Sequence, residues 1–209
     1  MIRKDFVFTS DEIEPNWFYK KYFYGGGNSR YWTFQMAMNL LSQQTDNPVI
    51  IETGCQRQED DLGAGMSTSI FGEYCKRYGG KCISVDLIEY HLNVCKRCTV
   101  EYAAHIDYVL SDSLEYLRNY NGPVDLLYLD SLDYPIGDNA GDETMRMASQ
   151  THCLLEFKSI EARLQPNTIL LVDDNMLPFG GKPKLLKTYL ESKGWTCLFD
   201  YQQSLWIRR

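Results

Sequence analysis

The sequence is short of several features that mark whole classes of protein. No run of apolar residues is long enough to span a bilayer, and the first residues lack the apolar stretch of a signal peptide. Basic residues are in deficit, because 21 Lys and Arg against 28 Asp and Glu leave a net charge of −7. Such a chain repels phosphates and anionic lipids, so neither nucleic acid nor a membrane is an expected partner. Internal repeats, low-complexity segments and linkers are also absent.

Cysteine occurs seven times, an odd number in a chain of 209 residues that can bury a substantial core. This favours reduced thiols over a disulfide framework, so we expect a soluble cytoplasmic protein. Cys95 and Cys98 form a CxxC pair, but no second Cys or His pair lies at zinc spacing, and both are expected to pack on a helix face. With 44% hydrophobic and 23% charged residues, the composition is that of one globular domain with extensions.

From residue 48 onward, short apolar runs alternate with amphipathic segments. Parallel strands are predicted at 48–51, 82–85, 106–110, 125–129 and 168–172. Helices are predicted over 67–78, through 92–102, over 113–120 and 142–164, and through 185–189. This alternation indicates a parallel sheet covered by helices on both faces. Only residues 200–203 separate the last two strands, 195–199 and 204–207, which is too short for a parallel crossover and predicts an antiparallel hairpin.

Every predicted parallel strand ends in polar residues, and most of these are acidic. The ends carry Glu52, Asp86, Ser111-Asp112, Asp130 and Asp173-Asp174-Asn175. A polar residue at one strand end can simply face solvent, so a single Asp means little. Five ends of five indicate a ligand site, because ligands of open α/β sheets bind at the carboxyl ends of the strands.

The loop after the first strand, from Gly54 to Gly65, narrows the choice of ligand. A dinucleotide site needs a G-x-G-x-x-G turn whose helix start binds pyrophosphate. This loop lacks the third glycine and carries three acidic residues at 59–61, which disfavour phosphate. An NAD(P)-dependent oxidoreductase is therefore the weaker alternative, and a cationic ligand without phosphate is preferred.

The next two strand ends suit the rest of such a ligand. Asp86 lies 21 positions after Gly65, where an acidic residue binds ribose hydroxyls, and Asp112 and Ser113 are expected to face an adenine edge. With the terminal hairpin, residues 48–209 resemble the class I methyltransferases that use S-adenosylmethionine (SAM). The resemblance implies a Rossmann-like α/β sandwich with a seven-stranded, mostly parallel sheet. It implies SAM binding by Glu52, Gly54, Gly63, Gly65, Ser67, Asp86, Asp112 and Ser113, and leaves open which glycine approaches the methionine part.

A second group of polar residues follows the fourth and fifth strands. Asp130 and the run 173–175 offer hard oxygen ligands, which suit Mg²⁺ or Ca²⁺. The pattern resembles metal-dependent O-methyltransferases of the catechol and macrocin-sugar kinds. That resemblance implies an ion held by Asp130, Asp174 and Asn175, with Asp173 as an alternative ligand. In the catechol type a lysine acts as base three positions after the first Asp. Here that position is Asp133, so a catechol is not the expected acceptor.

Methyl transfer from a sulfonium to an oxygen needs the oxygen deprotonated and in line with the S–CH₃ bond. A bound divalent ion supplies a lowered pKa and the positioning. The candidate catalytic residues are Asp130, His152 and Asp133. His152 lies on the helix predicted over 142–164, where a solvated or capping histidine is the alternative interpretation. A solvated helix face is the interpretation for Lys182, Lys184 and Lys187.

Together these features predict a SAM-dependent O-methyltransferase, assisted by a divalent metal, that acts on a small hydroxylated molecule such as a sugar or a polyketide-type metabolite. Two alternatives remain open at this stage. One is the NAD(P)-dependent oxidoreductase, and the other is a methyltransferase-like binding module that has lost its chemistry.

Residues 1–45 are expected to form an N-terminal extension to a methyltransferase-like domain of residues 46–209. The extension contains a predicted helix over 29–41 and a group of aromatic residues. These are Trp17, Phe18, Tyr19, Tyr22, Phe23, Tyr24, Tyr31 and Trp32. We interpret the segment as a cover over the strand ends that sets acceptor specificity, or as the contact of a homodimer.

Overall fold

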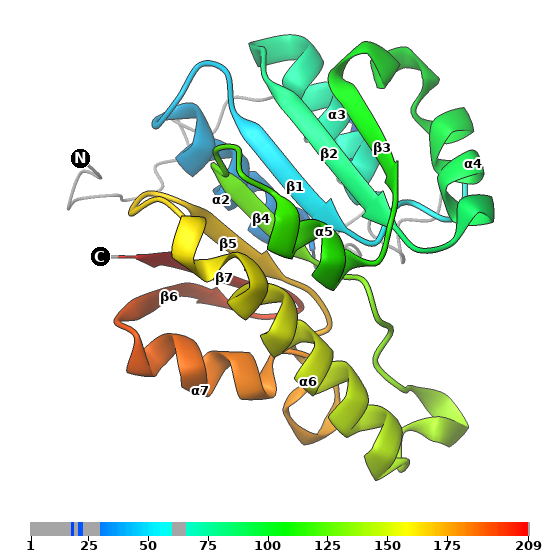
Figure 1. The fold of residues 1–209 in the computed structure, drawn as a ribbon, viewed down its shortest axis with the longest axis vertical. Helices are drawn as coiled ribbons and strands as arrows, with labels where there is room; N and C mark the ends of the chain where they lie inside the picture. Colours follow the sequence, from blue (N-terminus) through cyan, green and yellow to red (C-terminus); the bar gives the residue numbers. More distant parts are fainter. Residues whose placement is uncertain (1–17, 19–20, 23–29, 60–65, 209) are drawn as a thin grey trace.

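The computed structural model describes residues 18, 21, 22, 30–59 and 66–208. Within them, seven strands form one sheet in the order β3-β2-β1-β4-β5-β7-β6, with helices on both faces (Figure 1). The strands are β1 (Val49–Thr53), β2 (Lys81–Asp86), β3 (Ile106–Leu110), β4 (Leu126–Leu129), β5 (Ile169–Val172), β6 (Trp195–Asp200) and β7 (Ser204–Arg208). Strands β1 to β5 pair in parallel, and β7 runs antiparallel to both β5 and β6. The predicted sheet with its antiparallel terminal hairpin is therefore confirmed.

Helices cover the two faces of this sheet as separate layers. The α-helices are α2 (Tyr31–Ser42), α3 (Ser67–Tyr78), α4 (Glu89–Cys98), α5 (Ser113–Asn119), α6 (Glu143–Ile160) and α7 (Lys184–Ser192). Shorter 3₁₀ segments are η1 (Val100–His105), η2 (Gly137–Asn139), η3 (Glu161–Arg163) and η4 (Pro178–Gly180). Ile50 and Leu126 pack with α2 and α3, whereas Ile51 and Leu127 pack with α5, α6 and α7. Successive strand residues thus point into two different cores, which is why the central strands β4 and β5 are apolar at every position.

Helix α2 packs directly on the sheet, although it precedes the first strand in the chain. Phe34 of α2 meets Phe71 of α3 and Tyr128 of β4 edge to face, with ring centroids 5.7 and 5.6 Å apart. All three rings are buried in the larger core. This packing brings Arg30, the residue before α2, close to Asp173 at the carboxyl end of β5.

The helix predicted through residues 92–102 is in fact two segments. Helix α4 ends at Cys98 and the chain continues as η1. At the junction, the Thr99 hydroxyl donates a hydrogen bond to the Cys95 carbonyl oxygen at 2.7 Å, a local bond that competes with helix continuation. Cys95 is buried as expected, and all seven cysteines are free thiols.

Helix α3 has the predicted bounds, 67–78. The residue before the helix is Met66, in a left-handed conformation with a φ of 43°, and no side chain caps the helix end. The hydroxyl of Thr68 instead accepts a hydrogen bond from the Gln56 backbone N–H at 3.0 Å, which ties α3 to the loop after β1. No helix in the described part of the chain is long and apolar enough to cross a membrane.

Candidate active site

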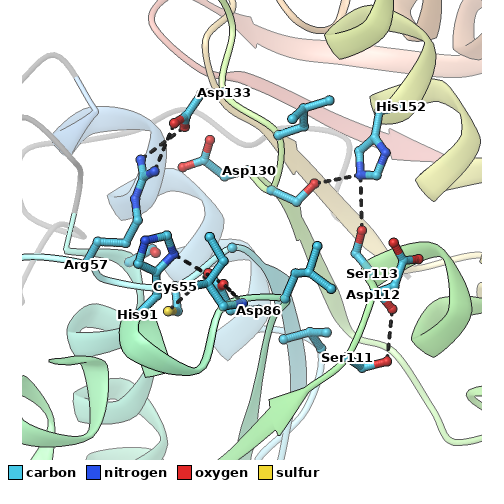
Figure 2. A pocket seen from close by; sticks show the side chains of 17 residues that line it. Cys55, Arg57, Asp86, His91, Ser111, Asp112, Ser113, Asp130, Asp133 and His152 are labelled. Atoms are coloured by element: carbon cyan, nitrogen blue, oxygen red, sulfur yellow. Dashed lines mark hydrogen bonds and ion pairs between the residues drawn. The ribbon is translucent and has the colours of Figure 1, made fainter. Parts of the chain in front are cut away.

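A cavity of about 330 Å³ lies at the carboxyl ends of β1 to β4 (Figure 2). All three predicted catalytic residues, Asp130, Asp133 and His152, line it. From the predicted cofactor set, the lining includes Gly54, Ser67, Asp86, Asp112 and Ser113. Residues that are far apart in the sequence therefore share one cavity, at the carboxyl ends of the strands where a ligand is expected. Two further predicted cofactor residues, Gly63 and Gly65, lie outside the described residues.

Gly54 shapes the turn between β1 and the cavity. Its φ is +81°, and a Cβ atom at this position would lie 2.4 Å from the carbonyl oxygen of Asp130. Only glycine tolerates both the left-handed backbone and the close approach. The Gly54 N–H donates to the Val85 carbonyl at 2.8 Å, and the Asp130 N–H donates to the Thr53 carbonyl at 3.0 Å. The turn is thus pressed against the end of β4, and Asp130 is held at the cavity edge.

Asp86, at the end of β2, has its carboxylate held from three directions. Its Oδ1 accepts a hydrogen bond from the Ile88 N–H at 2.8 Å and lies 3.3 Å from His91 Nδ1. The Cys55 thiol donates to Oδ2 at 3.4 Å. The carboxylate lines the cavity in a defined orientation, as a bidentate acceptor for two neighbouring hydroxyls must.

Glu52 lies within β1, below the cavity wall, and is fully buried. Its Oε1 accepts a hydrogen bond from the Ser84 hydroxyl at 2.7 Å. Burial raises the pKa of Glu52 to about 7, while the hydroxyls of Thr68 and Ser84 partly offset the rise. Glu52 therefore supports the floor of the site from below and is not part of the cavity lining.

His152 stands on α6 at the Ser113 side of the cavity, whereas Asp133 lies beside Arg57 at the other side (Figure 2). His152 Nε2 is 3.2 Å from the Ser113 hydroxyl, 3.0 Å from the Ser131 hydroxyl and 3.5 Å from Glu156 Oε1. The hydrogen bond with the buried Glu156 raises the pKa of His152 above its usual value. Glu156 was not among the predicted site residues, although it lies four positions after His152 on the predicted helix, a spacing that places both side chains on the same helix face.

Asp133 and Asp112 each have a defined partner as well. Arg57 Nη1 and Nη2 donate to the two carboxylate oxygens of Asp133 at 2.9 and 3.0 Å, a bidentate pair that lowers the pKa of Asp133 against the opposing effect of burial. Asp112 caps α5, since its Oδ1 accepts a hydrogen bond from the Glu115 N–H at 3.0 Å. These contacts give both residues a structural role in addition to the proposed functional one.

Lys182 is the largest departure from the sequence interpretation. It is only 2% exposed, so its placement on a solvated helix face was wrong. It lies two residues before α7, and its backbone N–H bonds to the Asp174 carbonyl at 3.1 Å, which turns the side chain inward. Lys182 Nζ donates to Asp130 Oδ1 at 2.7 Å and lies 3.2 Å from Asp174 Oδ2. Burial alone would lower the pKa of Lys182, but the two carboxylates outweigh it and raise the pKa.

Asp173 is paired with a residue from the N-terminal part of the chain. Arg30 Nε lies 2.9 and 2.8 Å from the two carboxylate oxygens of Asp173, and the Tyr128 hydroxyl donates to Oδ2 at 2.6 Å. Burial alone would raise the pKa of Asp173, but Arg30 outweighs it and holds the pKa below its ordinary value. No local sequence pattern indicated that Arg30 or Lys182 belongs to the site, because each contacts its carboxylates only after distant segments have packed together.

The predicted metal ligands do not form an open oxygen site. Lys182 fills the point where the Asp130 and Asp174 carboxylates converge. The side-chain amide of Asn175 donates to Asp200 Oδ1 at 2.7 Å and to the Tyr201 carbonyl. Within the described residues, no group of three or more His, Cys, Asp or Glu side chains is arranged to hold a metal ion. The described residues therefore do not fit Mg²⁺ or Ca²⁺.

Comparison with known families decides what kind of protein has this cavity. Residues 61–175, more than half of the chain, match a family described as a methyltransferase domain. The chain belongs to this methyltransferase family. The family match and the sheet order make it a SAM-dependent methyltransferase with the class I fold. No curated protein sequence matches the chain.

Several solved methyltransferase structures share the fold of this methyltransferase at low sequence identity. A Staphylococcus aureus protein described as a caffeoyl-CoA O-methyltransferase is 13% identical, with a TM-score of 0.58 over 85% of this chain and 83% of that chain. The SAH-bound methyltransferase PaMTH1 from Podospora anserina is 13% identical, with a TM-score of 0.57 over 94% and 89%. An rRNA methylase from Streptococcus thermophilus is 11% identical, with a TM-score of 0.53 over 83% and 95%. Their acceptors differ, so the fold alone does not identify the acceptor here.

Proposed function

We propose that this methyltransferase transfers the SAM methyl group to an oxygen of a small hydroxylated molecule. The observation that carries the proposal is the Asp130 carboxylate, which lines the cofactor cavity at the end of β4 with its side chain 25% exposed. The carboxylate is an acceptor-only group that faces the space where a hydroxyl can approach the methyl group.

We assign the cofactor to the wall between β1 and β3. Asp86 binds the ribose hydroxyls, Asp112 and Ser113 face the adenine edge, and Gly54 and Ser67 border the methionine part. Support for this arrangement comes from the shared cavity and from the oriented Asp86 carboxylate. His152 Nε2 lies between the hydroxyls of Ser113 and Ser131, at 3.2 and 3.0 Å, so it stands between the adenine edge and the acceptor end and is the second candidate proton acceptor.

At the acceptor end, Asp130 takes part in the transfer. The acceptor oxygen attacks the methyl carbon, so an O–C bond forms while the C–S bond breaks and its electron pair returns to sulfur. The hydroxyl proton passes to the Asp130 carboxylate. Asp133 at the rim, held by Arg57, orients the acceptor through hydrogen bonds. The transfer proceeds without a metal ion, because Lys182 occupies the place of the predicted ion.

The electrostatics of the cavity favour a small neutral acceptor over RNA. Among the described residues, four carboxylates line the cavity, those of Asp86, Asp112, Asp130 and Asp133, and the one arginine in this lining is already paired with Asp133. With a net charge of −7 on the chain, a polyphosphate backbone meets repulsion at the site and along the approach to it. Similar structures described as an rRNA methylase and a tRNA methyltransferase are 11% and 10% identical to this chain and share only its fold.

We also propose that residues 1–45 cover the acceptor end as an extension to the domain of residues 46–209, with a homodimer contact as the alternative use of their surface. Arg30 supports the first role. Its Nε donates to Asp173, and its Nη2 lies 3.7 Å from Asp174 Oδ1, the carboxylate that shares Lys182 with Asp130.

The test measures release of the demethylated cofactor from SAM with three acceptor sets: hydroxylated sugars and phenols, alkylamines, and total RNA. Turnover is expected with hydroxylated compounds only. Asp130→Asn is expected to lower turnover about a hundredfold, the usual contribution of a positioned proton acceptor, with SAM affinity by calorimetry unchanged. Asp138→Asn, an exposed position in η2, is the matched control. Methylation of RNA alone, or full turnover by Asp130→Asn, contradicts the proposal, and SAM binding without turnover on any set supports a binding module instead.

A further inference from the structure

Two carboxylates at the ends of neighbouring strands share one buried cation. Asp130 and Asp174 follow β4 and β5, which pair in parallel with Leu129 opposite Val172. Lys182 Nζ lies 2.7 Å from an oxygen of the first and 3.2 Å from an oxygen of the second. An ammonium group and a divalent ion, which needs oxygens at about 2.0–2.6 Å, cannot occupy this point together.

The chain holds Lys182 there by the geometry of the preceding loop. Gly181 has a φ of +64°, and a Cβ atom on it would lie 2.2 Å from the Asp174 carbonyl oxygen. The Gln150 side-chain amide of α6 donates to the Gly181 carbonyl at 3.0 Å, and the Lys182 N–H donates to the Asp174 carbonyl at 3.1 Å. The backbone on the N-terminal side of Lys182 is therefore tied to both α6 and the end of β5, and its side chain enters the carboxylate pair from a fixed direction.

Charge balance at this end of the site leads to the same conclusion. In their ionised forms Asp130, Asp173 and Asp174 carry three negative charges against two positive ones on Lys182 and Arg30, so at most one negative charge remains, and burial raises the pKa of Asp130, which reduces that charge further. An incoming divalent ion meets this single charge and also the repulsion of an ammonium at hydrogen-bond distance from both carboxylates. The cluster is nearly neutral as built and has little affinity left for a second cation.

We propose that Lys182 replaces the divalent metal ion at the acceptor end of this methyltransferase, as a built-in cation that positions Asp130 and makes methyl transfer independent of metal. The role assigned to Asp130 rests on the proposed function. Lys182 is a positioning residue, because it is buried behind Asp130 and acts on the acceptor through that carboxylate. The one cation thereby fixes the carboxylate that receives the proton and supplies positive charge close to the acceptor oxygen.

Mn²⁺ binding to the full chain, measured by electron paramagnetic resonance, tests whether Lys182 takes the place of the metal ion, and it needs no knowledge of the acceptor. Wild-type protein is expected to bind Mn²⁺ weakly, and Lys182→Ala is expected to bind it about tenfold more tightly or better, because two carboxylates lose their cation and a like charge is removed. Adding Asp174→Asn to Lys182→Ala is expected to abolish the gain. Lys184→Ala, at the exposed first residue of α7, is the matched control and leaves Mn²⁺ binding unchanged.

Activity provides the second measurement. Wild-type turnover is expected to be unaffected by excess EDTA, and Lys182→Met, which keeps the apolar stem without the charge, is expected to lose kcat with SAM affinity retained. Lys182→Arg restores part of kcat. Tight Mn²⁺ binding by the wild type, loss of wild-type activity in EDTA, or no gain of Mn²⁺ binding in a folded Lys182 variant overturns the proposal. If neither Lys182 variant folds, Mn²⁺ binding and EDTA sensitivity of the wild type still test the proposal. If no hydroxylated acceptor is found, the Mn²⁺-binding measurements on the wild type and the variants test it without an activity assay.

Discussion

Replacing Glu52 by glutamine changes the pH dependence of stability in a direction and by an amount that follow from its burial. Glu52 is fully buried in β1, and burial raises its pKa from 4.5 to about 7 in the folded protein. Between these two values the folded state binds a proton that the unfolded state has released. Stability therefore falls as pH rises through this window and levels off above about pH 7. At about 1.4 kcal/mol per pKa unit, the loss amounts to about 3 kcal/mol.

Glu52→Gln keeps the size of the side chain and removes its charge at every pH. The difference in unfolding free energy, variant minus wild type, is expected to rise by about 2–3 kcal/mol between about pH 5 and about pH 8, with the variant gaining. Urea unfolding followed by tryptophan fluorescence at several pH values measures it. Glu101→Gln, exposed in η1, controls for the loss of one surface charge. Parallel stability curves for wild type and Glu52→Gln across this range refute the reasoning, since they mean that Glu52 stays ionised in the core.

Two further predictions concern the cofactor wall. Asp86→Asn is expected to weaken SAM binding about tenfold in isothermal titration, because one charged acceptor for the ribose hydroxyls is lost. Asp107→Asn, on the exposed part of β3, is the control and leaves SAM binding unchanged. Equal SAM affinities for the two variants argue against a ribose contact. Gly54→Ala is expected to lower the unfolding free energy by about 2 kcal/mol or more, because alanine is strained at positive φ and its Cβ meets the Asp130 carbonyl. Gly141→Ala, with nothing within 4 Å of the added atom, measures the ordinary effect of the same exchange, and similar losses at the two positions contradict the argument.

The architecture was accessible from the sequence because it depends on local periodicity and on connection length. Apolar runs alternating with amphipathic segments place each strand and helix within a few residues of the observed bounds, and the short link at 200–203 dictates the hairpin. The strand-end residues were accessible for the same reason, since the carboxyl ends of parallel strands meet at one edge. Asp86, Asp112 and Asp130 indeed line a single cavity.

Local sequence patterns were therefore enough to predict the sheet, its terminal hairpin and the group of strand-end residues that line one cavity. The contacts that these acidic residues make, in contrast, depend on how the helices and strands pack. Lys182 was predicted to be solvated because nothing within its own segment indicates burial. A turn at Gly181 places its ammonium group between the carboxylates of Asp130 and Asp174. Arg30 reaches Asp173 from 143 positions away. Ion pairs of this kind depend on distances between side chains from different elements, and those distances exist only once the elements have packed.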